Sequence, residues 1–226
     1  VVFKDDPLKK VGCVPASESK RAIDYLNYRQ IPKDKWDELY AIENCQSLSS
    51  LDYKYKDRVF GNDPRLVLPF YSRQGKLIGV SGRALNNNKL RYLTLKFDDK
   101  EPLIYGLRTV DYNKRVYVTE GPIDSLFLDN AIAMAGSDAD GGINIQHQQC
   151  TMIYDNEPRN EHIVSRMIKA VDKNFNLVVW PKTLEHKDIN DMILSGKSTT
   201  QVQRLISNST YSGLTALQHI NNWKRI

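Results

Sequence analysis

From residue 115 onward, short apolar runs alternate with helical stretches, and this alternation constrains the fold more than any other feature of the sequence. Successive parallel strands need a crossover connection, which is usually a helix. The series therefore predicts an α/β fold with a parallel sheet and helices on its faces. The expected strands lie near residues 115–119, 131–135, 151–154 and 176–180, and the expected helices near residues 122–130, 143–149 and 159–173.

Acidic residues follow two of these expected strands. Glu120 comes directly after V-Y-V-T, and Asp155 and Glu157 come directly after T-M-I-Y. Open α/β sheets bind ligands at the carboxyl ends of their strands, and residues two apart in an extended segment point the same way. Magnesium is bound in proteins by a few carboxylates together with water and phosphate oxygens. The sequence therefore predicts a magnesium site formed by these acids.

Each acidic group also has a structural interpretation. Glu120 and Asp124, one helical turn apart, could cap a helix or complement its positive end. In a metal site, Asp124 would instead support a ligand. Asp155 and Glu157 could form a solvated turn that ends at Pro158. The presence of both groups at the ends of expected neighbouring strands favours the metal site.

The N-terminal half of the chain has a different pattern. An amphipathic helix near residues 18–29 and a shorter helical stretch at 33–40 precede a mostly β region at 41–113. Pro69 lies inside the first expected strand of that region, which predicts an edge position or a bulge, because proline cannot donate to a β-ladder. The expected strands of this region are residues 65–71, 76–83 and 91–97.

These patterns predict four parts along the chain. They are a linker or arm at residues 1–17, a basic mixed α+β subdomain at 18–113, a catalytic domain at 114–195 and a short helical tail at 196–226. Short helices near residues 188–194, 200–207 and 214–224 are expected to finish the chain.

Net charge is distributed unevenly. Residues 1–118 carry a net charge of +7 and residues 119–226 one of −2, which together give the +5 of the chain. A basic part that binds a polyanion and an acidic part that holds a divalent metal would produce this asymmetry, although chance could also produce it. Basic side chains of the β region are candidate phosphate contacts, and the alternative is a solvated charged face. They are Arg83, Lys89, Arg91 and Lys96.

Other features argue against several classes of protein. Cys13, Cys45 and Cys150 are far apart and lack paired cysteine or histidine spacing, which favours reduced thiols over a zinc site or disulfide. No apolar run approaches the roughly 20 residues of a membrane span, so no membrane partner is expected. Residues 137–142 (S-D-A-D-G-G) lack the glutamate of a calcium loop, and they are expected to form a loop near the active site.

Several motifs together resemble those of a known family. E-G-P-I-D-S-L and D-N-E-P-R-N resemble the Toprim signature, which bacterial-type primases share with topoisomerases, recombination-mediator proteins and small nucleases. G-V-S-G-R-A-L, R-Y-L-T and I-Y-G-L resemble the basic subdomain of bacterial primases, and K-D-I-N-D-M-I resembles the acidic segment after their Toprim sheet. The motifs are particularly similar to those of primases from T-even-type tailed phages, and the resemblance runs from about residue 20 to residue 224.

The resemblance implies a Toprim domain that carries out metal-dependent nucleotidyl transfer. Glu120, Asp155 and Glu157 would hold Mg²⁺, for which Mn²⁺ could substitute, and Asp124 would support Glu120. Glu157 stands where bacterial primases usually have aspartate, so its direct contact with the metal is less expected than that of Asp155. Two further acids could complete the cluster, or the first could cap a helix; they are Asp188 and Asp191.

The resemblance also assigns the basic subdomain a role. It points to Arg83, Arg91 and Tyr92 as contacts for template or nucleotide, with Tyr92 or Tyr105 able to stack on a base. Arg91 stands where bacterial primases usually have lysine, which keeps the charge and changes the geometry. The zinc-ribbon domain of the family is not found in the sequence, as expected for a fragment that begins at Val1.

The implied function is synthesis of RNA primers on a single-stranded DNA template from ribonucleoside triphosphates. A replicative helicase is the implied partner, and the cytoplasm of the infected bacterial host is the implied location. A Toprim nuclease, which would use the same acids to cleave DNA, is one alternative. A non-catalytic scaffold that binds helicase and DNA is another, and the acids at their expected positions argue against it.

Overall fold

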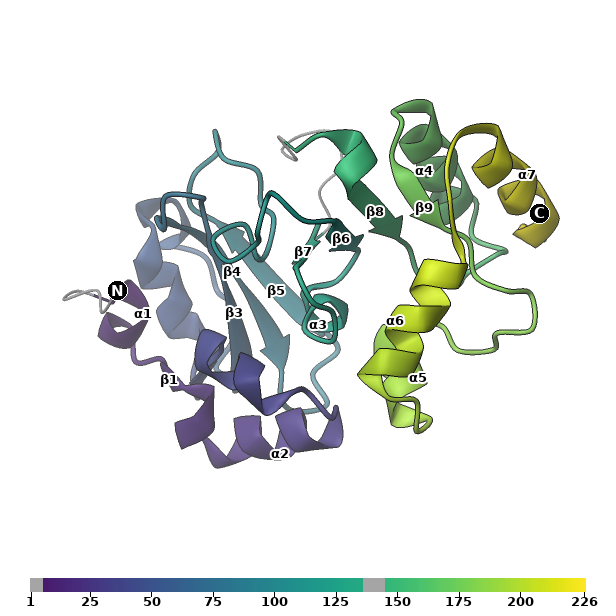
Figure 1. Ribbon diagram of the computed structural model, residues 1–226. Helices are drawn as coiled ribbons and strands as arrows, with labels where there is room; N and C mark the ends of the chain where they lie inside the picture. The colour runs from purple at the N-terminus through teal and green to yellow at the C-terminus, as the bar shows by residue number, and fades with distance from the viewer. Residues whose placement is uncertain (1–5, 136–144) are drawn as a thin grey trace. The chain divides into compact units, whose positions relative to one another are not determined.

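The structure is a computed structural model that describes residues 6–135 and 145–226. The chain forms two compact units, Val1–Leu103 and Ile104–Ile226, each with its own five-stranded sheet (Figure 1). The loop expected at residues 137–142 lies outside the described residues. In the part of the chain that is described, no helix is both long and apolar enough to cross a membrane.

The sheet of the first unit is antiparallel and has the strand order β1-β2-β3-β4-β5. β3, β4 and β5 correspond to the three strands predicted for this region. β1 and β2 are too short, at two and three residues, to show a recognisable alternation in the sequence. The strands are β1 (Val14–Pro15), β2 (Tyr40–Ile42), β3 (Arg65–Tyr71), β4 (Leu77–Ala84) and β5 (Tyr92–Lys96).

The helices of the first unit are short. The longest, α2, begins after Ser19, whose side chain accepts a hydrogen bond from the amide of Ala22, and it buries Ala22 and Leu26. These features confirm the predicted amphipathic helix. The helices are α1 (Pro7–Lys10) and α2 (Lys20–Tyr28), with 3₁₀ turns η1 (Ala16–Glu18), η2 (Lys33–Glu38), η3 (Cys45–Leu51) and η4 (Tyr53–Tyr55).

Residues 6–17 are packed, whereas the sequence predicted a linker or arm. Leu8 in α1 is fully buried in the same core as Val80, and β1 pairs with β2. Asp6 caps α1 and also accepts a hydrogen bond from the Tyr40 hydroxyl at 2.8 Å. A single buried leucine and a two-residue strand are too little periodic signal to reveal this packing from the sequence.

Pro69 lies in a strand that has neighbours on both sides. β3 lies between β2 and β4, but its pairing with β2 ends at Val67. At Pro69 there is thus no paired β2 residue, and the missing N–H leaves no gap in the ladder. Pairing with β4 continues past Pro69 and shifts register between Phe70 and Tyr71. Pro69 therefore lies at a local edge position of an internal strand, as predicted, and an irregularity follows just beyond the proline.

The sheet of the second unit has the strand order β10-β9-β8-β6-β7. Four of its strands run parallel, which confirms the predicted α/β fold. The fifth strand, β10, pairs antiparallel with β9 and was not predicted. The strands are β6 (Val116–Thr119), β7 (Ala131–Ala133), β8 (Cys150–Ile153), β9 (Asn176–Val178) and β10 (Thr210–Tyr211).

Helices of the second unit lie close to their predicted positions, except that α3 ends well before residue 130. Part of the predicted helix at 143–149 lies outside the described residues, and its described part is a 3₁₀ turn, η6. These helices are α3 (Pro122–Ser125), η6 (His147–Gln149), α4 (Glu161–Asp172), α5 (Ile189–Leu194), α6 (Thr199–Asn208) and α7 (Gly213–Trp223).

Helices α4 and α7 share the core of the second unit. They lie side by side next to β9 (Figure 1). α7 buries Ala216, Ile220 and Trp223 in this core, so the expected tail is part of the unit. The residues of α4 that were predicted to face the core are all buried; they are Ile163, Met167, Ala170 and Val171.

The division between the packing units falls after Leu103, earlier than the predicted boundary at residue 113. Ile104 and Val110 are buried in the same core as Val116. Residues that connect two predicted parts therefore pack with the parallel sheet. The four functional parts predicted from the sequence stay a prediction.

Candidate active site

The acids predicted at two strand ends lie next to each other. β6 and β8 are neighbours, with Thr119 opposite Ile153. Glu120 and Asp155 come just after these strands and therefore both lie at the carboxyl edge of the sheet. Glu120 Oε2 accepts a hydrogen bond from the backbone amide of Asp155 at 3.0 Å. This bond joins the two strand ends directly.

Two further acids reach the same edge from α3 and α5. Asp124 Oδ1 accepts a hydrogen bond from the amide of Asn190 at 3.0 Å, which connects α3 to α5. Asp188 caps α5 by accepting a hydrogen bond from the amide of Asp191 at 2.8 Å. Asp188 thus has the capping role considered from the sequence and also lies in the cluster. One small pocket is lined by Glu120, Asp124, Asp155 and Asp188.

Two of the predicted site acids do not line this pocket. Glu157 instead accepts hydrogen bonds from Lys187 Nζ and Asn160 Nδ2, both at 2.7 Å. Asp191 is half-buried on α5, where its backbone amide takes part in the helix cap. The structure therefore places Glu157 next to Lys187 beside the pocket, and Asp191 in the first turn of α5.

An arginine that the sequence analysis did not identify pairs with the cluster. Arg166 on α4 forms an ion pair with Glu120, and its Cζ lies 5.2 Å from the centre of the Tyr154 ring. The signal in the sequence is its spacing, because Arg166 follows the buried Ile163 by three residues on an amphipathic helix. A cation on the inward side of a helix needs a buried partner.

Lys187 was also missed, although it begins the K-D-I-N-D-M-I segment. Its Nζ lies 3.5 Å from Asp155 Oδ2 and 2.7 Å from Glu157 Oε1. Lys187 therefore connects the pocket to Glu157. The ion pair with Glu157 raises the pKa of Lys187 to about 12, so this lysine carries its charge at neutral pH.

Asp155 has the strongest electrostatic perturbation of these acids. Burial is the main cause that raises its pKa from 3.8 to about 6, and the nearby charges of Glu120, Asp188 and Glu157 add to the rise, whereas Lys187 opposes it. Hydrogen bonds from Lys187 and Asn160 instead lower the pKa of Glu157. Repulsion among the carboxylates exceeds the effect of the neighbouring lysine at Asp155, and an added cation would relieve it.

The acidic cluster fits a hard divalent cation by its donor chemistry. Its four side chains offer carboxylate oxygens, which are the ligands that magnesium takes together with water and phosphate. In the described ranges, no three His, Cys, Asp or Glu side chains are already arranged to hold a metal. The present partners of Glu120 and Asp155 are Arg166 and Lys187, so metal binding requires these side chains to rearrange.

The predicted nucleic-acid contacts lie in the first unit, except Tyr105, which is buried in the second unit. Arg83 in β4 lies opposite Tyr92 in β5, and its Cζ is 4.9 Å from the centre of the Tyr92 ring. The same Cζ lies 5.9 Å from the centre of the Tyr25 ring on α2. Contacts of this kind orient a guanidinium group by cation–π attraction. Arg83 and Tyr92, which the resemblance pointed to as nucleic-acid contacts, therefore lie in contact with each other.

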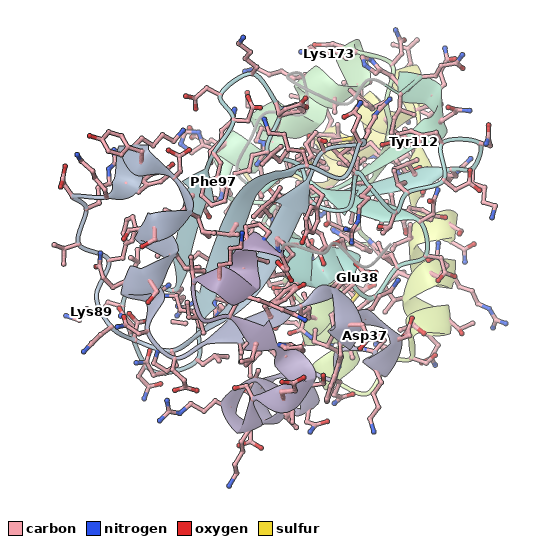
Figure 2. All side chains as sticks on the ribbon, turned by 90° about the vertical axis from the view of Figure 1, so that its left-hand side faces the viewer. Asp37, Glu38, Lys89, Phe97, Tyr112 and Lys173 are labelled. Carbon is pink, nitrogen blue, oxygen red and sulfur yellow. The ribbon has the colours of Figure 1, made fainter. Side chains whose placement is uncertain are left out.

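The remaining basic candidates lie on β5 or on the segment that joins β4 to β5. Lys89 and Arg91 are exposed between β4 and β5, and Figure 2 shows Lys89 at the outer edge of the unit. Lys96 lies on the same face of β5 as Tyr92, because side chains alternate along a strand. Its Nζ donates to the backbone carbonyl of Asp99 at 3.3 Å.

Comparison with known proteins shows which proteins the chain resembles in sequence and in fold. No protein-family model matches it. A curated relative, the DNA primase of Enterobacteria phage T4, is 34% identical over 215 residues, which cover 93% of this chain and 62% of the relative. The E. coli primase catalytic core matches with a TM-score of 0.64 at 14% identity, over 96% of this chain and 78% of that one. The chain has the fold of a primase catalytic core.

This primase fold confirms the resemblance predicted from the motifs. A DnaG primase catalytic domain solved with single-stranded DNA also matches, with a TM-score of 0.60 at 14% identity over 87% of this chain and 73% of that one. The chain spans 62% of the length of the phage T4 relative. The acidic pocket lies in the parallel-sheet unit of the primase fold, and the Arg83–Tyr92 pair lies in the antiparallel unit.

Proposed function

We propose that the chain is the RNA-polymerase core of a phage-type primase and synthesises RNA primers by nucleotidyl transfer. One observation carries the proposal: four carboxyl side chains line one small pocket at the carboxyl edge of the parallel sheet, in a chain with the fold of a primase catalytic core. The relationship to the phage T4 primase supports it. Open α/β folds bind their ligands at this edge.

In the proposed mechanism, Glu120 and Asp155 would hold Mg²⁺ or Mn²⁺, and Asp124 and Asp188 complete the acidic pocket. When bound, the metal ion would lower the pKa of the attacking 3′-hydroxyl and neutralise the pyrophosphate that leaves. Glu157 shares Lys187 with Asp155 and would join this site through its longer side chain. Asp124 also fixes α5, through its hydrogen bond to Asn190.

The proposed template is single-stranded DNA, and the proposed substrates are ribonucleoside triphosphates. The matching DnaG catalytic domain was solved with single-stranded DNA, which supports such a template here. Arg83, Lys89, Arg91 and Lys96 would contact phosphates, and Tyr92 would stack on a base. We further propose a replicative helicase as partner and the cytoplasm of the infected bacterial host as the place of action.

The test is an assay with single-stranded DNA, Mg²⁺ and labelled ribonucleoside triphosphates, in which the unmodified chain is expected to make short RNA. Asp155→Ala should abolish the product and leave the fold and most DNA binding intact, because it removes a metal ligand. Asp129→Ala is the matched control, since Asp129 is exposed and lies outside the pocket. Cleaved DNA without RNA would instead identify a nuclease, and full activity of Asp155→Ala would contradict the metal assignment.

A further inference from the structure

Asn156 lies between two of the acids, Asp155 and Glu157, and its side chain contacts distant parts of the chain. Its Nδ2 donates to the carbonyls of Leu184 at 2.8 Å and His186 at 3.0 Å. Its backbone amide also donates to the carbonyl of Lys187, at 2.6 Å. One residue of the loop after β8 thus binds three positions of the loop that leads to α5.

The same asparagine contacts the end of α7. Its Oδ1 accepts a hydrogen bond from Trp223 Nε1 at 3.0 Å, and Trp223 is 3% exposed. Arg225 adds two more contacts, from its amide to the Pro158 carbonyl at 2.8 Å and from Nη2 to the Lys182 carbonyl at 3.4 Å. Residues 223–225 therefore connect to both loops.

These two loops carry the charged groups of the candidate site. The loop after β8, residues 154–160, holds Asp155 and Glu157, and the loop after β9, residues 179–188, holds Lys187 and Asp188. Neither loop is part of a helix or strand ladder, so hydrogen bonds to neighbouring segments help to set its position. A carboxamide suits this task because it offers two donors and an acceptor, whereas aspartate at the same position would lack the donors.

We propose that Asn156 and Trp223 are positioning residues that hold the loops at residues 154–160 and 179–188 in place relative to each other. The end of α7 would then help to set the geometry of the active site. The proposal rests on the proposed function, because it concerns the geometry of the same metal site. Residues that orient metal ligands typically change metal affinity or activity by about 10- to 100-fold when removed.

The test compares variants that remove these hydrogen bonds with little change in size. Trp223→Phe removes one N–H and keeps an aromatic ring in the core, and Asn156→Leu removes all three side-chain hydrogen bonds of the asparagine. Trp36→Phe is the matched control, because Trp36 Nε1 also donates to one carbonyl, that of Ile31 at 3.0 Å in the first unit. The double variant Asn156→Leu/Trp223→Phe completes a cycle that isolates the shared bond.

Two measurements are made on each folded variant, as judged by circular dichroism. The first is Mn²⁺ affinity by electron paramagnetic resonance, which needs no activity. The second is primer synthesis as a function of Mg²⁺. We expect Asn156→Leu to weaken Mn²⁺ binding and lower kcat about 10- to 100-fold, and Trp223→Phe to do so about 3- to 10-fold. Trp36→Phe should stay within about twofold of the unmodified chain, and the double variant should be no worse than Asn156→Leu.

The proposal is overturned if Trp223→Phe matches Trp36→Phe in both Mn²⁺ affinity and kcat. It is also overturned if the two substitutions are fully additive, because they would then act independently. Should the unmodified chain make no RNA, the proposed function fails, and the Mn²⁺ measurements still decide the inference. If Asn156→Leu does not fold, the comparison of the two tryptophan variants decides it alone.

Discussion

Arg166 shows how single residues compensate the charge of the acidic cluster. Its partner, Glu120, has a side chain that is 18% exposed, and the side chain of Arg166 is 27% exposed. An ion pair with this degree of burial contributes through what its removal leaves behind, which is a half-buried carboxylate without its counter-ion. A divalent cation at the cluster would take over the same electrostatic role.

We therefore predict that Arg166→Met lowers the free energy of unfolding by about 1–3 kcal/mol in metal-free buffer. Added Mg²⁺ should stabilise this variant more than it stabilises the unmodified chain, because the ion replaces the missing positive charge beside Glu120. Urea unfolding with EDTA and with Mg²⁺ measures both effects.

Arg21→Met is the control for this prediction. Arg21 pairs with Glu43 at the surface, where both side chains are more than half exposed. Its removal should cost less than about 1 kcal/mol, with no dependence on Mg²⁺. An equal response of the Arg166 and Arg21 variants to Mg²⁺ would exclude the compensating role of Arg166.

At the scale of elements, α1 and β1 are held to the first unit by the burial of Leu8 and by the pairing of β1 with β2. Leu8→Ala should lower the free energy of unfolding of the first unit by about 2–5 kcal/mol, because Leu8 is fully buried and its removal leaves a cavity. Leu214→Ala, at a position that is 86% exposed, should change stability by less than about 0.5 kcal/mol. Chemical unfolding followed by near-ultraviolet circular dichroism compares them. A negligible effect of Leu8→Ala would mean that residues 6–17 are a free arm after all.

The helices and strands differ in how well the sequence predicts them. Alternating or helical runs such as β5 and α4 are predictable, because their periodicity extends over several residues. β1, β2 and β10 are hidden, because two or three residues define no period and their pairing depends on distant neighbours. The same limit applies at the site. Strand-end acids follow from local pattern, whereas the ion pairs of Arg166 and Lys187 depend on how α4 and the loop before α5 pack.

At the scale of the whole molecule, basic and acidic residues are separated along the chain. The net charge of residues 1–118 is positive and that of residues 119–226 is negative. The Arg83–Tyr92 pair lies in the first unit and the acidic pocket in the second. This separation predicts that DNA binding and bond formation can be impaired independently.

We expect the double substitution Lys89→Ala/Arg91→Ala to weaken binding of single-stranded DNA and to leave Mn²⁺ binding unchanged. The plot of log affinity against log salt concentration has a negative slope, and the magnitude of this slope should decrease by about 0.7 for each phosphate that the variant no longer neutralises. Fluorescence anisotropy over a range of salt concentrations measures this slope. Lys169→Ala, which removes an exposed charge from α4, is the control. An unchanged slope in the double variant would show that this edge of the sheet does not bind DNA.

The indole hydrogen bonds give the molecule an internal optical probe. Of its three tryptophans, Trp180 donates to the carbonyl of Tyr154 at 2.8 Å and Trp223 donates to Asn156, so each binds a residue next to Asp155 in the chain. Trp36 lies in the other unit. In the Trp36→Phe chain, all tryptophan emission would therefore arise beside the acidic pocket. Titration of that chain with Mg²⁺ or a nucleotide could then be followed by its own fluorescence, without attaching a dye.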